Sequence, residues 1–528
     1  MGRIALDYVS PLPPVRSGIS DYSRDLLPHL AAVADLRVLR LPGQEVSAEM
    51  EERWRPAELA RCGEGGRLPL YQMGNNRYHA AVLETAWRLP GVLTLHDLVL
   101  HHFLLDRTAG QGDWEGYAAE LARDHGWVGE VVARPVRFGG FGEAAQFALL
   151  ANRALARRQR GVLVHSAWAA ALLREEDAEL AVRAVPMGIP LPPAVDDSAG
   201  RRLRARLGIP LEAPLVGSFG FQTPIKRTDV VIRALAAPGL ERVHLLVAGE
   251  LSPYVFYDRE AREAGVAERV HVTGFLSYEE LEAGIAACDL ALNLRYPTAG
   301  ETSASLLRVL ALGRPVIVSD YAQFAELPAE IAVRLAPGEG ESDRLAAALR
   351  ELLGAPGALA AMREAARRYV ASEHDPARAA RAIAAACEEL AAAEPPGDSA
   401  VVLPPPSTLT WGELPGDLEL LGAEAPWPGG ERRTLRLRLT NRSRATWMAG
   451  ESGAGGVAIE VRLDTPRGDR LAGRPWLALP RDLAPGETLE VTFELRRPLG
   501  PARLHVEPHV LGAASFSRLG GPVWEAEL

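Results

Sequence analysis

Lysine is nearly absent from this chain of 528 residues. Lysine and arginine together number 58, yet lysine occurs only once, at Lys226. Cysteine is also scarce, with three widely separated residues, Cys62, Cys288 and Cys387. An odd and scattered set fits neither a disulfide framework nor a zinc site with paired ligands, so the sequence indicates a reducing compartment.

Long apolar runs and an excess of positive charge are lacking as well. The amino terminus, MGRIALDYVS, has neither the basic start nor the apolar segment of a signal peptide, and no uncharged apolar stretch approaches about 18 residues. We therefore expect a cytoplasmic protein and leave open a peripheral contact with the inner face of the membrane. The net charge of −10 argues against a general nucleic-acid binder.

The chain does contain two series of short apolar runs that alternate with helical patterns, within 3–188 and within 214–338. Such runs, mostly ending at Gly, Ser, Asp or His, are typical of buried parallel strands. Two sets of six strands predict an α/β fold of two Rossmann-like domains in tandem, residues 1–192 and 193–393. The second domain is expected to end in an alanine-rich helix at 376–393.

Other regions depart from this alternation. Residues 191–200 are the expected hinge, and the aromatic- and arginine-rich insertion at 103–160 is expected to be helical, as a cover over the first domain or as part of an acceptor site. A proline-rich linker is expected at 394–408. Alternating polar and apolar residues from 409 to 528 predict an antiparallel β-sandwich. Five tryptophans in it are expected mainly in the core or at edges, with stacking on sugars as the alternative: Trp411, Trp427, Trp447, Trp476 and Trp524.

The single lysine lies between an expected strand and an expected helix, in GSFGFQTPIKRTD. Ligands of doubly wound sheets bind beyond such strand ends, and a helix start favours anions through its free N–H groups and its dipole. A compact ammonium suits one oxygen of a crowded phosphate better than a broad guanidinium does. A surface lysine without function is the alternative. A P-loop is excluded, because Ile225 stands where that motif requires glycine.

A second candidate site follows the strand expected at 290–294. Glu301 lies on a glycine-flanked loop, and Thr302 and Ser303 are candidate N-caps of the next helix. A carboxylate beside an anion site needs another partner, and sugar hydroxyls fit that role. Arg308 lies about two helical turns beyond Glu301, a spacing that would place the two side chains on the same helix face. Arg308 is expected either in a salt bridge or against a ligand.

The first domain contributes two further candidates at the same expected cleft. His96 and Asp97 end a strand there, and His96 is either catalytic or structural. A metal site with His101 and His102 is disfavoured, because the HD pairs of metal phosphohydrolases lie on helices and a strand precedes this pair. Gly18 belongs to a strand, turn and helix segment whose backbone N–H groups can bind a phosphate or a sugar.

Together these motifs resemble the retaining, nucleotide-sugar-dependent glycosyltransferases of family 4, which have the GT-B fold. The resemblance covers about residues 3–390. It rests on SGISDYS, the strand-end His96, SFGFQTPIKR, VHVTGFLSYEEL and GETSASLLRVLALGRPVIVSD.

The resemblance implies roles for these residues. Lys226 would hold the donor diphosphate and stabilise the charge that develops as the glycosidic bond breaks. Glu301 would hold hydroxyls of the donor sugar, and His96 would lie beside the transferred sugar. The remaining expected substrate-binding residues are Gly18 on the amino-terminal loop, Phe275 at the nucleotide base, Thr302 and Ser303 at the phosphates, and Asp97, Gly220, Arg227 and Arg308.

Two positions depart from the family pattern. Family members usually carry an arginine where this chain has Phe221, and a second glutamate, which holds the ribose, at about the place of Arg308. Arg227 is expected to supply part of the missing positive charge.

The resemblance implies a retaining, hexosyl-type glycosyltransferase. It would move a sugar from a nucleotide-diphosphate donor to a carbohydrate, lipid-linked or other glycan acceptor, without a metal or another cofactor. The alternatives are a non-catalytic relative that binds sugars or a partner protein, and a nucleotide-sugar epimerase or sugar phosphorylase on the same fold. The C-terminal domain resembles the immunoglobulin-like sandwiches appended to some bacterial enzymes of this kind. The sequence predicts neither the oligomeric state nor the sugar, the base and the acceptor.

Overall fold

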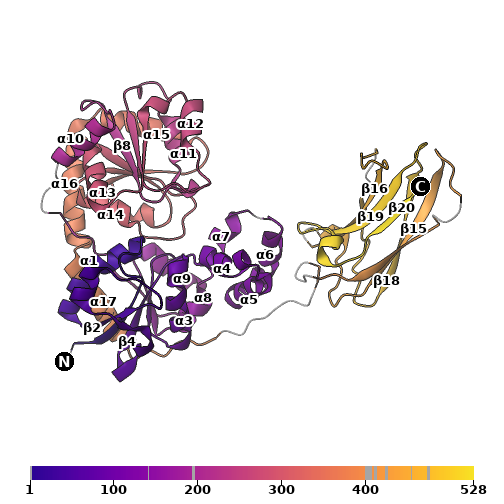
Figure 1. Cartoon of the computed structure of the whole chain (residues 1–528), viewed down its shortest axis with the longest axis horizontal. Coiled ribbons are helices and arrows are strands. Elements are labelled where there is room, and N and C mark those ends of the chain that lie inside the picture. Colours follow the sequence, from indigo (N-terminus) through magenta and orange to yellow (C-terminus); the bar gives the residue numbers. More distant parts are fainter. Residues whose placement is uncertain are drawn as a thin grey trace. The chain divides into compact units, whose positions relative to one another are not determined.

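The computed structural model divides into two compact units (Figure 1). Met1–Leu100 and Asn152–Asp398 form the first unit, and His101–Ala151 and Ser399–Leu528 form the second. The residues described are 3–140, 142–192, 197–398, 407–408, 413–422, 426–452, 455–471 and 476–528.

The amino-terminal half of the first unit is built on a parallel sheet of seven strands. These strands are β1 (Ala5–Val9), β2 (Asp35–Arg40), β3 (Ala57–Glu58), β4 (Leu68–Met73), β5 (Val92–Leu95), β6 (Gly161–Val164) and β7 (Val182–Ala184). Their order across the sheet is β3-β2-β1-β4-β5-β6-β7. The six predicted strands are confirmed, and β3 is the additional one. Its two residues are too few to produce an apolar run in the sequence.

The second half of this unit is a parallel sheet of six strands, as the sequence predicts. These are β8 (Leu215–Phe219), β9 (His244–Ala248), β10 (Val270–Gly274), β11 (Leu290–Asn293), β12 (Val316–Ser319) and β13 (Ala332–Leu335), in the order β10-β9-β8-β11-β12-β13. Chain order reverses beside β1 and β4 in the first sheet and beside β8 and β11 in the second. Ligands of doubly wound sheets bind at such switch points, beyond the carboxyl ends of the strands.

Helices flank both sheets (Figure 1). They are α1 (Gly18–Val33), α2 (Ala48–Trp54), α3 (Ala80–Arg88), α8 (Arg153–Arg157), α9 (Ala167–Glu176), α10 (Asp197–Arg206), α11 (Thr228–Ala234), α12 (Tyr257–Glu263), α13 (Tyr278–Ala287), α14 (Ala304–Ala311), α15 (Glu341–Leu353), α16 (Pro356–Glu373) and α17 (Pro376–Leu390). The predicted alanine-rich helix is α17, and it packs against α1 of the amino-terminal half. Ala380 and Cys387 are fully buried in a cluster that also contains Leu26. The two halves therefore share part of one core.

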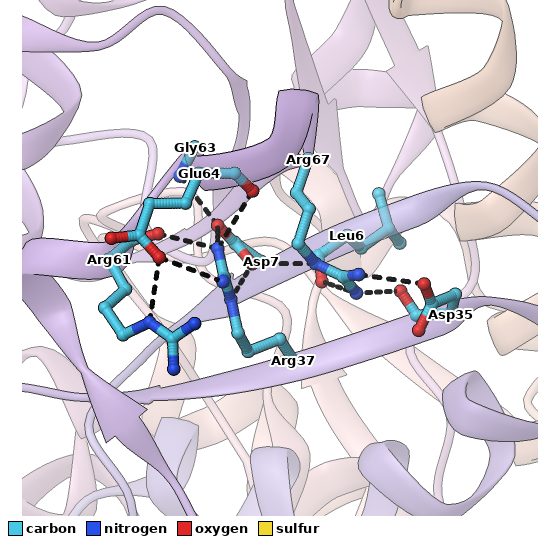
Figure 2. A network of polar contacts seen from close by, with 8 residues as sticks. All are labelled: Leu6, Asp7, Asp35, Arg37, Arg61, Gly63, Glu64 and Arg67. Atoms are coloured by element: carbon cyan, nitrogen blue, oxygen red, sulfur yellow. Dashed lines mark hydrogen bonds and ion pairs between the residues drawn. The ribbon is translucent and has the colours of Figure 1, made fainter.

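A buried carboxylate on β1 connects β2 and the loop before β4 (Figure 2). Asp7 in β1 is fully buried. Arg37 donates two hydrogen bonds of 2.7 Å to its two oxygens, Arg67 donates one of 3.1 Å, and the backbone N–H of Gly63 donates one of 2.7 Å. Each carboxylate oxygen thus accepts two hydrogen bonds, which compensates for the loss of water.

Replacing Asp7 by alanine should reduce the free energy of unfolding of the first unit by about 3–5 kcal/mol, because Arg37 and Arg67 would lose their buried anion. Urea denaturation followed by circular dichroism measures this change. Asp35→Ala is the matched control, because Asp35 pairs with Arg67 while its own side chain is largely exposed. Equal stabilities of the two variants would contradict the account.

The second unit contains the predicted helices and the predicted antiparallel sheets. The helices within the insertion are α4 (His101–Arg107), α5 (Trp114–His125), α6 (Trp127–Arg137) and α7 (Ala144–Ala148). One sheet contains β14 (Gly416–Leu421), β15 (Arg432–Asn441) and β18 (Thr488–Arg496), and the other contains β16 (Val457–Asp464), β17 (Trp476–Ala478), β19 (Arg503–Val510) and β20 (Trp524–Glu527).

The tryptophans of this all-β part divide by burial. Trp427 and Trp447 belong to the hydrophobic core, whereas Trp524 is half-buried and Trp476 is 44% exposed. Trp411 lies outside the described residues, as do the central part of the expected hinge, 193–196, and most of the expected proline-rich linker, 399–406. Trp524 packs against this core from β20 and Trp476 lies on β17, and both strands are at the edges of their sheet. The prediction that the tryptophans lie in the core or at edges therefore holds for all four that can be placed.

Across the described ranges, no single helix combines the length with the apolar character that crossing a bilayer requires. The pair Glu341–Leu353 and Pro356–Leu390 meets those criteria only when its segments are joined, and they are bent by 95°.

Candidate active site

A cleft of about 920 Å³ lies within the first unit, where the two sheets present the carboxyl ends of β1, β5, β8 and β11. Residues from both halves line it. Every candidate site residue from the sequence except Arg227 is among them: Gly18, His96, Asp97, Gly220, Lys226, Phe275, Glu301, Thr302, Ser303 and Arg308. A smaller hollow of about 570 Å³ beside α10 and α13 gathers none of these residues.

Lys226 is a buried cation at the cleft, in the short turn Pro224–Lys226 after β8. Its ammonium donates a hydrogen bond to the backbone carbonyl of Phe219. Burial and the nearby Arg295 guanidinium lower the pKa of Lys226 well below its usual value, while the Glu301 carboxylate acts in the opposite direction. The ammonium is therefore under-compensated in the unliganded site, and an anion in the cleft would stabilise it.

Gly220 leaves space for the Lys226 ammonium. Its backbone has a φ of +89°, in the left-handed region that favours glycine. A Cβ atom at this position would lie 3.1 Å from Lys226 Nζ and 3.7 Å from Ser305 Oγ. A larger residue would therefore crowd both the ammonium and the start of α14.

Glu301 lies in the loop before α14 rather than on the helix itself. Its Oε2 accepts hydrogen bonds from the hydroxyl of Thr298, at 2.8 Å, and from the backbone N–H of Ala299, at 3.1 Å. Its Oε1 lies 3.1 Å from Nε of Arg295. These contacts fix the carboxylate at the cleft wall. Because Glu301 precedes the helix, the expectation that it shares a helix face with Arg308 is wrong.

Arg295 is a functional candidate that the sequence reading missed. It is buried, lines the cleft, and lies two residues after the end of β11, much as His96 follows β5. The signal was therefore present as a cation at a strand end. Phe221, which stands where the resembling family usually has an arginine, is 56% exposed. Arg295 lies near the Lys226 ammonium and provides a second positive charge there.

Arg227, which the sequence nominated for that task, is not brought to the cleft. Its backbone adopts a left-handed conformation with φ of +57°, and its guanidinium donates a 3.0 Å hydrogen bond to the buried carboxylate of Glu341. That partner directs the side chain away from the other candidates. Arg227 therefore forms an ion pair with Glu341 and does not line the cleft with the other candidates.

The start of α14 presents hydroxyl groups to the cleft. Ser303 is the N-cap, and its Oγ accepts a 3.2 Å hydrogen bond from the backbone N–H of Leu306. The Oγ atoms of Ser303 and Ser305 lie 3.1 Å apart. Thr302, the other N-cap candidate, lies one residue before the cap and also lines the cleft. The helix dipole and these hydroxyls favour a negatively charged ligand group here.

His96 follows β5 and is buried against two other aromatic rings. Its ring centre lies 4.8 Å from that of Tyr22 and 5.1 Å from that of His165. Its Nε2 lies 2.9 Å from Oε1 of Gln72, while its Nδ1 has no hydrogen-bond partner among the described residues. Burial lowers the pKa of His96 well below its usual value, so the ring is neutral near pH 7.

Asp97 is half-buried in the cleft and accepts a 2.8 Å hydrogen bond from the backbone N–H of Asn75. Burial, with a smaller contribution from the nearby Glu301 carboxylate, raises the pKa of Asp97 to about 7, while the hydrogen bond from Asn75 and the Arg295 guanidinium act in the opposite direction. Asp97 is therefore partly protonated near neutral pH and can then donate a hydrogen bond.

Stability should depend on the ionisation of Asp97. Its pKa is higher in the folded state, so its stabilising contribution is complete below its ordinary value of 3.8 and is lost as the pH rises through about 7. Compared with Asp97→Asn, the wild type should lose on the order of 3 kcal/mol of unfolding free energy between pH 4.5 and pH 7.5. Urea titrations of both proteins at each pH measure the difference. If the unfolding free energies of the wild type and Asp97→Asn changed in parallel with pH, the raised pKa of Asp97 would be contradicted.

Arg308 joins the two halves of the unit. Its Nη2 lies 3.3 Å from Oδ2 of Asp25 on α1, and its guanidinium carbon lies 4.4 Å from the ring centre of Tyr278. Arg24 approaches the same ring at 5.0 Å. Arg308 therefore both lines the cleft and makes the salt bridge that was the alternative from the sequence, with a partner that the sequence did not suggest.

Phe275 and Gly18 lie at the mouth of the cleft. The guanidinium carbon of Arg16, from the loop after β1, lies 4.8 Å from the ring centre of Phe275, which is 55% exposed. Gly18 is the first residue of α1 and directly follows the N-cap Ser17. A Cβ atom at Gly18 would meet no atom within 4 Å, which leaves space for a ligand beside it.

Within the described residues, no group of three or more His, Cys, Asp or Glu side chains is arranged to hold a metal ion. His101 instead lies 2.7 Å, through Nε2, from the hydroxyl of Tyr117 in the second unit.

Comparison with known proteins agrees with this geometry. Residues 213–355, which include Lys226, Arg295 and Glu301, match the family model described as glycosyl transferases group 1. The fold is similar to that of sucrose-phosphate synthase (tll1590) from Thermosynechococcus elongatus, with 17% identity, a TM-score of 0.52, and coverage of 74% of this chain and 99% of that one. This similarity establishes the GT-B arrangement of two Rossmann-like domains.

Two further structures are less similar. Anabaena Alr3699/HepE in complex with UDP-glucose has 16% identity and a TM-score of 0.47, covering 73% of this chain and 99% of that one. WaaG, a glycosyltransferase involved in lipopolysaccharide biosynthesis, has 17% identity and a TM-score of 0.48, covering 72% and 98%. No curated protein matches the sequence.

Proposed function

We propose that this protein is a retaining, hexosyl-type glycosyltransferase of family 4 that uses a nucleotide-diphosphate sugar and transfers the sugar to a glycan or other hydroxyl-bearing acceptor. One observation carries the proposal. Two buried cations, Lys226 and Arg295, converge with Glu301 and the start of α14 in one cleft at the switch points of both sheets. A cation pair beside a carboxylate suits a ligand that joins a phosphate to a polyol.

The cations and the helix start would bind the diphosphate. Within the described residues, the Lys226 ammonium donates its hydrogen bond to the neutral carbonyl of Phe219 and not to an anion. A donor phosphate would supply that negative charge, and the favourable interaction would grow as the leaving diphosphate gains charge during bond cleavage. Arg295 would add a second positive charge in place of the arginine that Phe221 replaces.

Glu301 and His96 would hold the transferred sugar. The Glu301 carboxylate is fixed by Thr298, Ala299 and Arg295, so it presents acceptor lone pairs without reorganisation. His96 faces the cleft from the other half with a neutral ring. A sugar held from both halves lies where water is displaced, which limits hydrolysis of the donor. Retention itself rests on the family resemblance, and the anomeric proton coupling of the product by NMR tests it.

A metal should not be required, because Lys226, Arg295 and the start of α14 provide the positive charge that a divalent ion supplies elsewhere. Sugar transfer should therefore proceed at about the same rate with ~5–10 mM EDTA, which binds the divalent ions, as with added Mg²⁺ or Mn²⁺. Loss of activity in EDTA with recovery on adding one metal would contradict this.

Binding and turnover test the function. UDP, GDP and ADP are screened by thermal shift, since a ligand of the folded state raises the melting temperature. UDP-glucose, GDP-mannose and ADP-glucose are then assayed for release of free nucleotide with glycan acceptors. Nucleotide release with sugar transfer supports the proposal. Binding of a nucleotide without turnover would indicate a non-catalytic relative. Conversion of the sugar nucleotide without an acceptor would indicate an epimerase, and a reaction that depends on inorganic phosphate would indicate a phosphorylase.

A cytoplasmic location with peripheral contact at the inner face of the membrane is part of the same proposal. Fractionation of expressing cells tests it, with a high-salt wash to release protein held at the membrane surface by charge.

A further inference from the structure

The amino-terminal half of the cleft contains three buried polar atoms without partners. Ser20 Oγ, Tyr22 Oη and His96 Nδ1 make no hydrogen bond within the part of the chain that the structure describes, although all three side chains line the cleft. These residues are 1%, 3% and 5% exposed, respectively. Native proteins pair the large majority of buried polar atoms, so three unpaired atoms on one cleft wall require an explanation.

The protonation of each group follows from its surroundings. His96 Nε2 faces Oε1 of Gln72, whose amide nitrogen lies 3.3 Å from the hydroxyl of Thr94. His96 therefore donates through Nε2 and keeps a lone pair on Nδ1. Burial raises the pKa of Tyr22 well above its usual value, so its phenol keeps the proton. The wall thus offers one neutral acceptor and two hydroxyls that both donate and accept.

A hydroxyl group complements this set better than an ion does. It can donate to the Nδ1 lone pair and accept from a phenol or serine hydroxyl, and it carries no charge that burial would penalise. The cations that suit an anion, Lys226 and Arg295, are contributed by the other half of the unit. The part of the amino-terminal wall formed by Ser20, Tyr22 and His96 is therefore neutral and rich in hydroxyls, while the charged residues Arg16, Asp21, Arg24 and Asp97 line other parts of the same half.

We propose that Ser20, Tyr22 and His96 form a carbohydrate subsite that binds hydroxyl groups of an uncharged sugar. This inference rests on the proposed function and adds Ser20 and Tyr22, on the first turns of α1, as specificity residues. The hydroxyls belong either to the sugar of the donor or to the acceptor. In the unliganded protein the unpaired atoms destabilise the fold, and the bound sugar removes that cost.

Tyr22→Phe isolates the effect, because it deletes only the unpartnered oxygen. The ring contacts, at 4.8 Å to His96 and 5.6 Å to His165, do not need the hydroxyl. Removing a buried polar atom without a partner should leave the melting temperature unchanged or raise it. Tyr8→Phe is the matched control, because Tyr8 is fully buried and its hydroxyl lies 3.0 Å from that of Ser23. That variant should lower the melting temperature and leave ligand binding unchanged.

Calorimetric titrations of the wild type, Tyr22→Phe, Ser20→Ala and Tyr8→Phe use two sets of probes. The first set pairs UDP with UDP-glucose, GDP with GDP-mannose and ADP with ADP-glucose. The second adds methyl α-glucoside or methyl α-mannoside to the protein saturated with the free nucleotide. Tyr22→Phe should weaken binding of one sugar-bearing probe about tenfold, as expected for one lost hydrogen bond, and leave the free nucleotide unaffected.

Weaker binding of the sugar nucleotide would place the hydroxyls on the donor, and weaker binding of the methyl glycoside would place them on the acceptor. Either result supports the subsite. It is overturned if the wild type binds a sugar-bearing probe and Tyr22→Phe binds it equally well, or if Tyr22→Phe melts at a lower temperature, as Tyr8→Phe does. A wild type that binds none of the nucleotides would instead refute the proposed function, and with it this subsite.

Discussion

Replacing Lys226 by alanine should lower kcat for sugar transfer about 100- to 1,000-fold, the loss found when one preorganised charge-stabilising donor is removed from an active site. The ammonium is buried at the cleft beside Arg295, and its hydrogen bond within the described residues goes to the backbone carbonyl of Phe219. Its interaction with the leaving diphosphate is strongest in the transition state, so kcat falls more than KM rises. Steady-state kinetics with saturating donor separate the two parameters.

The fold should tolerate this change, because the variant removes a charge whose pKa burial already lowers. Circular dichroism and the melting temperature check this point. Arg233→Ala is the matched control, since Arg233 is a largely exposed cation on α11 that pairs with Asp229. It should retain normal kcat. Near-normal turnover of Lys226→Ala would rule out the role proposed for the ammonium.

Glu301→Gln should lower kcat/KM about 100-fold, since it removes the charge that strengthens hydrogen bonds to donor-sugar hydroxyls and leaves Arg295 without its carboxylate. The glutamine keeps the size of the side chain and one oxygen for Thr298 or Ala299. Affinity for the free nucleotide should change little, because the proposed contact of Glu301 is with the sugar. Parallel measurements of kcat/KM for the sugar nucleotide and of Kd for the nucleotide test this division.

Glu263→Gln on α12 is the control for loss of a carboxylate, because Glu263 is exposed and forms a surface ion pair with Arg259. It should leave both quantities unchanged. A Glu301→Gln variant that loses nucleotide affinity as strongly as catalytic efficiency would show that the carboxylate acts on the diphosphate end, contrary to the proposed sugar contact.

The sequence predicted most of the architecture because its strands are short, apolar and separated by helices. All six strands of the second sheet and six of the seven in the first were predicted. Periodicity could not reveal β3, which has two residues. It also could not show that α17 returns to pack on α1, because an apolar helix face does not specify which domain will cover it.

The site was predictable wherever it follows the strand-end rule. His96, Lys226 and Glu301 all lie in segments that follow strands of the two sheets, and the structure places all three at one cleft. The rule applies equally to Arg295, which was overlooked. The sequence could not show that Arg227 lies outside the cleft, because its left-handed backbone and its contact with Glu341 cannot be inferred from a loop sequence. The contact between Arg308 and Asp25 joins residues 283 positions apart, beyond the reach of any local pattern.

The most direct test of the account is a crystal structure with a bound sugar nucleotide. The diphosphate should lie within hydrogen-bond distance of Lys226 Nζ and the Arg295 guanidinium, with its oxygens toward Ser303 and the start of α14 and the sugar between Glu301 and His96. A nucleotide bound outside this cleft, or a Lys226 ammonium that still donates to the Phe219 carbonyl and leaves the phosphates uncontacted, would contradict the account.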